Sequence, residues 1–341
     1  MSLNISQYGI PVSRLSLFLQ TGLFRTLASV GGKLAGLWNP SHTRTPSRIQ
    51  WIDATLGEGR ASEAIRLVIY TPDPPSTSLP PSRPGVIVFH GGGNICGSST
   101  DDARWATYLV DHLGAVVIGV DYRLAPSYPF PIPVEDCASS ILHISNNSHE
   151  YGIDRDKLFV SGFSAGGNLA FASYMLLQAK DSDYQINDAL RPKIRGLLGF
   201  YPVLDYSVSR ETKRARSLRP DLTLPLYLAN LFDASYIDET VDRFDSRLSP
   251  ALASTRLISS LPGVHLCLCE FDMLLSEGQA FHDRIRTSGG DCSLRIVKGE
   301  QHGWDKGPRS AAKESVDIEY EQAASRISSW LAETLPGPST S

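Results

Sequence analysis

The sequence predicts an α/β protein built on a mostly parallel sheet with crossover helices. Short apolar runs rich in β-branched residues end in turn residues and are followed by segments long enough for a helix. This alternation is the pattern of strands joined by helices in a parallel sheet. The chain has 341 residues, a length that suits one large α/β domain as well as two smaller ones.

Seven apolar runs are expected to be strands of this sheet. They lie at residues 65–70, 86–89, 116–120, 158–160, 194–200, 264–269 and 294–297. Residues 72–84 are dense in Pro and Ser, which predicts a loop. From Val316 to Leu331 apolar residues recur at helical spacing, so a closing amphipathic helix is expected to pack one face on the sheet.

Composition and charge exclude several classes of protein. The chain has 32 Lys and Arg against 36 Asp and Glu, a net charge of −4, which argues against nucleic acid as a partner. No apolar run approaches the roughly 18 residues of a stable membrane span. The first residues lack a secretory signal pattern, and the five cysteines are scattered without zinc-site spacing. A cytoplasmic protein without a bound metal is therefore expected.

The beginning of the chain has a different charge balance. Residues 1–52 contain no Asp or Glu and carry five basic residues. Such a segment is typical of a mitochondrial transit peptide or of a helix that lies on a membrane surface. Folded helices whose acidic residues lie elsewhere in the chain are the simpler interpretation.

The strongest local pattern is Gly-Phe-Ser-Ala-Gly at residues 162–166, where a buried strand gives way to an Ala-rich helix. A serine on a tight strand-to-helix turn presents its Oγ above the sheet, and the flanking glycines let the backbone bend that sharply. Ser164 is therefore the candidate nucleophile. Ordinary glycine-rich turns can carry the same pattern, so its position directly after a strand is what favours catalysis.

A serine nucleophile also needs N–H donors for the negative oxygen that develops during attack. His90, Gly91, Gly92 and Gly93 follow a predicted strand, and the glycines leave their amides unshielded. We expect the amides of Gly92, Gly93 and Ala165 to hold that oxygen. A phosphate-binding loop is the alternative, but neither the Lys-Ser/Thr of a P-loop nor the further glycines of a dinucleotide fingerprint follow.

The order of residues along the chain suggests a general base and an orienting acid. His302 lies in a loop directly after the last predicted strand. In hydrolases whose serine stands on such a turn, the order is Ser, then Asp or Glu, then His. The preceding strand at 264–269 is followed by Glu270 and Asp272. Asp272 is preferred as the acid that orients the imidazole of His302, and Glu270 is its local competitor.

Several motifs in order resemble the hormone-sensitive-lipase family of α/β-hydrolases. Residues 90–93 match its His-Gly-Gly-Gly motif, residues 121–126 its Asp-Tyr-Arg-Leu-Ala-Pro, and residues 162–168 its Gly-Asp-Ser-Ala-Gly-Gly-Asn. Asp272 and His302 match the acid and the histidine of the family's later motifs. Five linked motifs in the same order make the resemblance specific.

The resemblance covers roughly residues 85–304 and implies an α/β-hydrolase fold. That fold has a mostly parallel eight-stranded sheet, helices on both faces and a helical cap over the site. The resemblance implies that the cap comes from N-terminal helices at 1–51 and from an insertion at about 206–249. The catalytic domain would then span 52–335, followed by a flexible tail at 336–341.

Three residues depart from the family's usual motifs. Phe163 replaces the Asp before the serine, Met273 replaces the Pro after the acid, and Ser127 replaces the Glu after Leu-Ala-Pro. None of these changes removes a triad or oxyanion group. Phe163 adds an apolar side chain beside the nucleophile and is a candidate pocket residue. Trp304, next to the base, is a second candidate, with a packed core Trp as the alternative.

The resemblance implies a serine esterase that hydrolyses carboxylic esters of short or medium acyl chain through an acyl-enzyme intermediate, without a cofactor. Its expected partner is a small-molecule ester, and a homodimer is left open. One alternative is a hydrolase or acyltransferase acting on an amide, lactone or ester of a specialised metabolite, because the same triad serves every acyl transfer. The other is a non-catalytic receptor, as in the plant gibberellin receptor, which resembles this family but lacks the catalytic histidine.

Overall fold

The structure describes most of the chain. The computed structural model covers residues 4–5, 11–38, 43–57, 64–73, 82–179, 184, 186–306 and 313–333. Only the backbone is described for residues 4–5, 11–12 and 28–38. The predicted tail at 336–341 lies outside the described residues.

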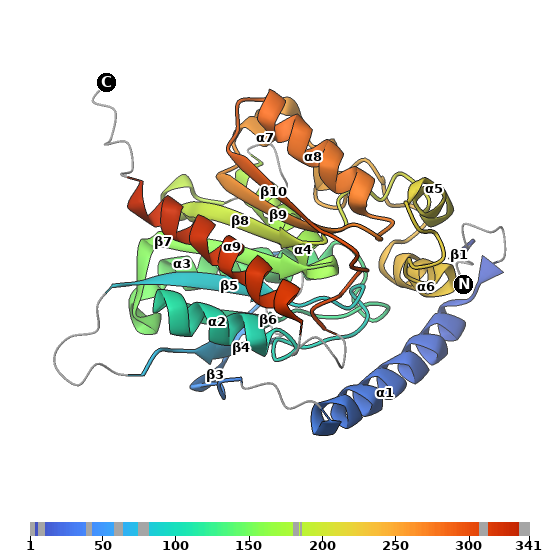
Figure 1. Ribbon diagram of the computed structural model, residues 1–341, viewed down its shortest axis with the longest axis horizontal. Helices are drawn as coiled ribbons and strands as arrows, with labels where there is room; N and C mark the ends of the chain where they lie inside the picture. The colour runs from blue at the N-terminus through green and yellow to red at the C-terminus, as the bar shows by residue number, and fades with distance from the viewer. Residues whose placement is uncertain are drawn as a thin grey trace.

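One eight-stranded sheet has the order β10-β9-β8-β7-β5-β6-β4-β3 (Figure 1). Its strands are β3 (Arg48–Asp53), β4 (Ala64–Tyr70), β5 (Arg83–Phe89), β6 (Val116–Asp121), β7 (Ile153–Phe163), β8 (Ile194–Phe200), β9 (Gly263–Cys269) and β10 (Cys292–Val297). Neighbouring strands run parallel from β10 to β6, while β4 and β3 join antiparallel at one edge. A separate antiparallel pair is formed by β1 (Asn4–Ile5) and β2 (Pro11–Val12).

Helices cover both faces of the sheet. The described part of the chain has the helices α1 (Arg14–Trp38), α2 (Ala103–Leu113), α3 (Ile132–Asn146), α4 (Ala165–Gln178), α5 (Arg210–Arg216), α6 (Leu226–Tyr236), α7 (Thr255–Ser259), α8 (Leu275–Thr287) and α9 (Glu314–Ala332). Helices α3, α4 and α8 pack in the core cluster on one face, and α2 and α9 in the cluster on the other. Among the described residues, none of the helices combines the length and the apolar character needed to cross a bilayer.

The central strands form two cores because successive side chains of a strand point to opposite faces. In β5, Val86 and Val88 belong to the α2 and α9 face, whereas Ile87 and Phe89 belong to the α3, α4 and α8 face. All four side chains are at most 2% exposed. The sequence of a strand buried on both faces is a continuous apolar run. These strands could therefore be predicted although their apolar and polar residues do not alternate.

Helices α1, α5 and α6 lie together at one end of the sheet, beside the ends of the parallel strands (Figure 1). Helices α5 and α6 come from the insertion at 206–249, and α1 comes from the N-terminal segment. The ring of Phe24 in α1 meets that of Phe232 in α6 edge to face at 5.9 Å. Two segments far apart in the sequence therefore form one layer.

The seven expected strands are β4 to β10, and the closing helix is α9. The N-terminal boundary needs a correction, because residues 48–53 form β3 and pair with β4, so residue 51 lies inside a strand of the sheet. The sequence did not predict this strand because it lies at the edge of the sheet, where only Ile52 of its six residues is buried. The strand β7 is also longer than the predicted 158–160. The prediction missed its beginning because residues 154–157 are all charged.

The indole of Trp330 packs on glycines of two neighbouring strands, which predicts a packing defect when either glycine is enlarged. A Cβ on Gly263 would lie 2.2 Å from the Trp330 ring, and one on Gly196 2.5 Å from it. We expect Gly263→Ala to lower the thermal unfolding midpoint by about 2–6 °C through overpacking. The control is Gly22→Ala, whose methyl meets no atom within 4 Å. If Gly263→Ala lowers the unfolding midpoint equally in a Trp330→Leu variant, the contact with Trp330 is not the cause and the explanation is wrong.

A buried histidine in β9 predicts acid sensitivity of the fold. Burial, helped by the charges of Arg326 and Arg295, lowers the pKa of His265 to about 4. The unfolded chain therefore binds this proton below about pH 6.5 and the folded chain does not, so stability falls as the pH falls from 6.5 towards 4. Denaturant unfolding at pH 7 and at pH 4.5 gives the free energy of unfolding that is lost on acidification. We expect this loss to be roughly 2–3 kcal/mol smaller in His265→Leu than in the unmodified chain. Equal losses would assign the acid sensitivity to other groups.

Candidate active site

Ser164 lies on the sharp turn between β7 and α4. Its φ of 53° and ψ of −114° are values that residues other than glycine rarely adopt. A Cβ on Gly162 would lie 2.1 Å from the Gly166 carbonyl oxygen, and one on Gly166 would lie 2.0 Å from that of Phe89. Only glycines at these two positions let α4 begin so close to β7 and β5.

A chain of two hydrogen bonds joins Ser164, His302 and Asp272. Nε2 of His302 lies 2.8 Å from Ser164 Oγ, and its Nδ1 lies 2.6 Å from Asp272 Oδ2. The three residues follow β7, β10 and β9, whose carboxyl ends meet at one edge of a parallel sheet. Because an ionised carboxylate only accepts, Nδ1 carries the proton and Nε2 accepts from the serine hydroxyl.

Glu270, the local competitor for the acid position, points elsewhere. Its carboxylate accepts from Lys298 Nζ and from the Gly299 amide, each at 2.8 Å. The hydrogen bond from Lys298 lowers the pKa of this partly exposed carboxyl. Asp272, by contrast, is only 2% exposed and also accepts the Leu274 amide at 3.1 Å.

The donor loop, residues 90–97, runs directly beside the nucleophile. A Cβ on Gly91 would lie 3.6 Å from Ser164 Cβ. Gly92 and Gly93 have φ values of 116° and 61°, which favour glycine. Gly93 lines the same pocket as Ser164, and Ala165 opens α4, where the first amides have no acceptor inside the helix.

His90 supports the donor loop from behind. Its ring stacks on Tyr122 at 4.3 Å, and the Tyr122 hydroxyl donates to the His90 carbonyl at 2.8 Å. Its Nδ1 lies 2.7 Å from the carbonyl oxygen of Gly91. Buried in this way, His90 holds the loop in place and lies away from the pocket that Ser164 lines.

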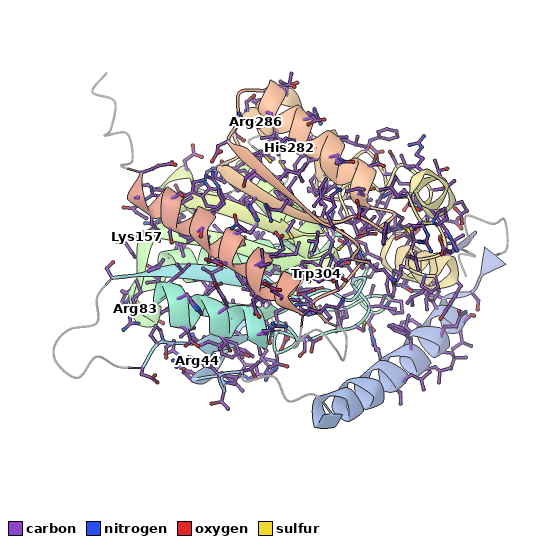
Figure 2. All side chains as sticks on the ribbon, viewed as in Figure 1. Arg44, Arg83, Lys157, His282, Arg286 and Trp304 are labelled. Atoms are coloured by element: carbon purple, nitrogen blue, oxygen red, sulfur yellow. The ribbon has the colours of Figure 1, made fainter. Side chains whose placement is uncertain are left out.

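Phe163 and Trp304, the two candidate pocket residues, pack instead in the core on the α2 and α9 face. Phe163 stacks on Phe200 at 4.5 Å, and Trp304 (Figure 2) meets Tyr201 edge to face at 5.4 Å. Neither lines the pocket beside Ser164. The two residues were predicted to line the pocket because they adjoin catalytic positions in the sequence. Phe163, however, is still part of β7, and its side chain faces the core.

An ion cluster built on two buried carboxylates anchors the segment that carries the histidine. Lys306 Nζ lies 2.7 Å from Asp102 and 2.8 Å from Asp305. Asp305 also accepts the hydroxyls of Tyr201 and Tyr320 at 2.5 and 2.8 Å. Burial acts to lower the pKa of Lys306, but the two carboxylates outweigh it and leave that pKa raised. No motif in the sequence indicated this cluster.

A pocket opens at Ser164 and encloses about 370 Å³ of empty space, part of it open to solvent. It is lined by Gly93, Ser164, Val203, Tyr206, Arg210, Leu224, Ala229, Phe232, Asp272, Met273, Leu274 and His302. Five of these residues come from the insertion at 206–249, which carries no recognisable motif. Within the described part of the chain, no group of three or more His, Cys, Asp and Glu side chains is placed to hold a metal.

Comparison with known proteins agrees with this geometry. Residues 86–306 match a protein family described by the alpha/beta hydrolase fold. An arylesterase from Saccharolobus solfataricus is 32% identical over 234 residues, which are 68% of this chain and 72% of the relative. An arylacetamide deacetylase from Bos taurus is 28% identical over 346 residues, covering 85% of this chain and 84% of the relative.

Solved structures have the same fold. A hyperthermophilic esterase from the archaeon Pyrobaculum calidifontis is 26% identical with a TM-score of 0.74, covering 93% of this chain and 94% of that one. A thermostable esterase from Pseudomonas putida has a TM-score of 0.78 at 21% identity, covering 92% and 91%, which is a likeness of fold. The chain belongs to the hormone-sensitive-lipase-like family of α/β-hydrolases.

Proposed function

We propose that this chain is a serine esterase that hydrolyses carboxylic esters of short or medium acyl chain through an acyl-enzyme intermediate. The observation that carries the proposal is the hydrogen-bonded series Ser164, His302 and Asp272, at 2.8 and 2.6 Å, on the wall of a pocket. The arylesterase among the relatives supports ester hydrolysis.

Ser164 is assigned nucleophilic attack. His302 accepts its proton at Nε2 while Oγ bonds to the ester carbonyl carbon. Asp272 stays ionised and stabilises the imidazolium through Nδ1. His302 then passes the proton to the leaving alcohol, the ester C–O bond breaks, and the acyl group remains on Oγ. Water then gives a proton to His302 as its oxygen bonds to the acyl carbon. The bond between Oγ and the acyl carbon breaks, His302 returns the proton to Ser164 Oγ, and the acid leaves.

The amides of Gly92, Gly93 and Ala165 are assigned the developing oxyanion. Donors fixed before the reaction stabilise the charge of the tetrahedral intermediate without reorganising during it. Support comes from the passage of the donor loop beside Ser164 and from the position of Ala165 at the first turn of α4.

The proposed preference for an alkyl acyl group follows from the walls of the pocket. Leu224, Phe232 and Leu274 are apolar and line the pocket together with Ser164. Apolar walls favour an alkyl group by removing it from water. The proposed limit to short or medium chains rests on the resemblance to the family.

We propose further that the N-terminal segment as far as α1 and the insertion at 206–249 form the cap. The edge-to-face contact of Phe24 with Phe232 supports a shared layer. Arg25 supports it as well, since its guanidinium donates to the carbonyl of Ile95 in the donor loop. A targeting segment that is removed would make no such contacts with the body.

Cysteine chemistry supports a cytoplasmic location, which we also propose. All five cysteines carry free thiols. Burial raises the pKa of Cys267 and Cys269, neighbours on one face of β9, well above the ordinary value, which keeps both thiols protonated. Free thiols at this density are typical of a reducing compartment.

Amide hydrolysis is the second candidate activity. The bovine relative is named for deacetylation of an arylacetamide, and the same triad can attack an amide carbonyl. A receptor without turnover is disfavoured, because the serine, acid and histidine positions are all filled.

Replacing the nucleophile is expected to abolish turnover without unfolding the protein. Ser164→Ala should lower kcat/KM for p-nitrophenyl butyrate by about 10³-fold or more and prevent labelling by a fluorophosphonate. Ser173→Ala is the matched control, since its hydroxyl donates only to backbone carbonyls inside α4. The same assay with p-nitroacetanilide measures the amide candidate. Unchanged ester hydrolysis in Ser164→Ala would exclude the proposed mechanism.

The two acidic residues after β9 are expected to differ in their effect on the rate. Asp272→Asn should lower kcat by about 10³–10⁴-fold, because the imidazole of His302 loses its fixed tautomer. Glu270→Gln should stay within about threefold, because that carboxylate pairs with Lys298 at the surface. Steady-state kinetics of both variants on one ester decides the assignment. A larger loss in Glu270→Gln would reverse it.

A further inference from the structure

Arg210 brings a charged donor into the pocket beside the nucleophile. It lies on α5, is 5% exposed, and lines the pocket together with Ser164 and His302. Apart from Asp272 and His302, it is the one charged side chain among the residues lining this pocket. An arginine buried in an apolar pocket costs free energy unless its donors find acceptors.

One edge of the Arg210 guanidinium is already occupied. Its Nε and Nη2 donate to the two oxygens of Asp233 at 2.8 and 2.7 Å, a bidentate pair. The ring of Tyr206 lies 5.5 Å from the guanidinium carbon and restricts the plane of the group. Within the described part of the chain, Nη1 makes no hydrogen bond, so its two N–H groups and the second N–H of Nη2 are the donors left for a ligand.

The charges around Arg210 are balanced. Asp233 neutralises Arg210, and Glu277 neutralises Lys213 in an adjacent buried pair at 2.5 Å. Burial acts to lower the pKa of Arg210, but the charge of Asp233 and its hydrogen bonds outweigh burial and raise that pKa. A ligand carboxylate would add a buried anion that nothing here balances, which is costly. A neutral oxygen acceptor takes the Nη1 hydrogens without that cost.

We propose that Arg210 is a specificity-determining residue that selects esters carrying a neutral oxygen acceptor, such as a ketone or an amide carbonyl, a few bonds from the scissile bond. The inference rests on the proposed esterase activity and names its substrate class. Leu224, Phe232 and Leu274 bind the apolar atoms of that group, and Arg210 binds its oxygen. A plain alkyl group of the same length would cover Nη1 without offering it an acceptor.

Matched esters test the proposal on the unmodified protein. For an acyl group in the pocket, p-nitrophenyl 4-oxopentanoate is compared with p-nitrophenyl pentanoate and with the charged half-ester p-nitrophenyl hydrogen glutarate. For an alcohol in the pocket, 3-oxobutyl acetate is compared with butyl acetate. Each kcat/KM is divided by the rate of alkaline hydrolysis, which removes intrinsic reactivity. We expect the normalised kcat/KM of the keto ester to exceed that of its alkyl partner by about tenfold or more in one of the two series.

A variant that removes the ion pair as a whole assigns the preference to Arg210. In Arg210→Met with Asp233→Leu, no unpaired carboxylate is left buried, and circular dichroism checks the fold. The keto-to-alkyl ratio should fall to about one. The control is Arg247→Met. It breaks a bidentate but less buried pair with Asp245 in the same insertion and lies outside the pocket lining, so the ratio should persist.

Three results would overturn the inference. The first is equal normalised rates for the keto and alkyl esters in both series. The second is a ratio that survives in the double variant, and the third is a preference for the charged half-ester. Failure of the two proposals is distinguishable: alkyl esters turned over without a keto preference contradict only the role of Arg210. No turnover of any ester contradicts the esterase activity and the inference with it.

Discussion

The position of the nucleophile depends on the close approach of three backbone segments at the start of α4. The carbonyl oxygens of Gly166 and Phe89 occupy the space that Cβ atoms on Gly162 and Gly166 would need. Any side chain at either glycine would push α4 away from β7 and β5. The strained backbone at Ser164, the free amide of Ala165 and the nearness of the donor loop all follow from this contact.

Most of the fold and the candidate triad could be predicted because short, local patterns encode them. A parallel strand buried on both faces is a continuous apolar run, and the turn after β7 needs its glycines next to the serine. Asp272 and His302 were found from their positions after successive strands, since these strands end at one edge of the sheet. The edge strand β3 was not predicted because its six residues mix polar and apolar side chains and only Ile52 among them is buried.

The parts that could not be predicted depend on contacts between distant segments. Phe163 and Trp304 adjoin catalytic positions in the sequence, yet both side chains face the core. Arg210 belongs to an insertion without motifs, and its place at the pocket depends on how α5 and α6 pack. Phe163 also replaces a charged residue of the family motif, and here Lys306 lies 3.6 Å above its ring, with its charge balanced by carboxylates nearby.

The contact between α6 and the donor loop limits how the pocket can be redesigned. The ring of Phe232 rests against Gly93, where a Cβ would come within 2.2 Å of it. The same ring forms a wall of the pocket and meets Phe24 of α1. Trimming Phe232 to admit larger acyl groups would therefore remove the support of an amide assigned to the oxyanion. A variant with a smaller side chain at position 232 would therefore accept larger acyl groups, but its acylation and deacylation steps would be slower for every substrate.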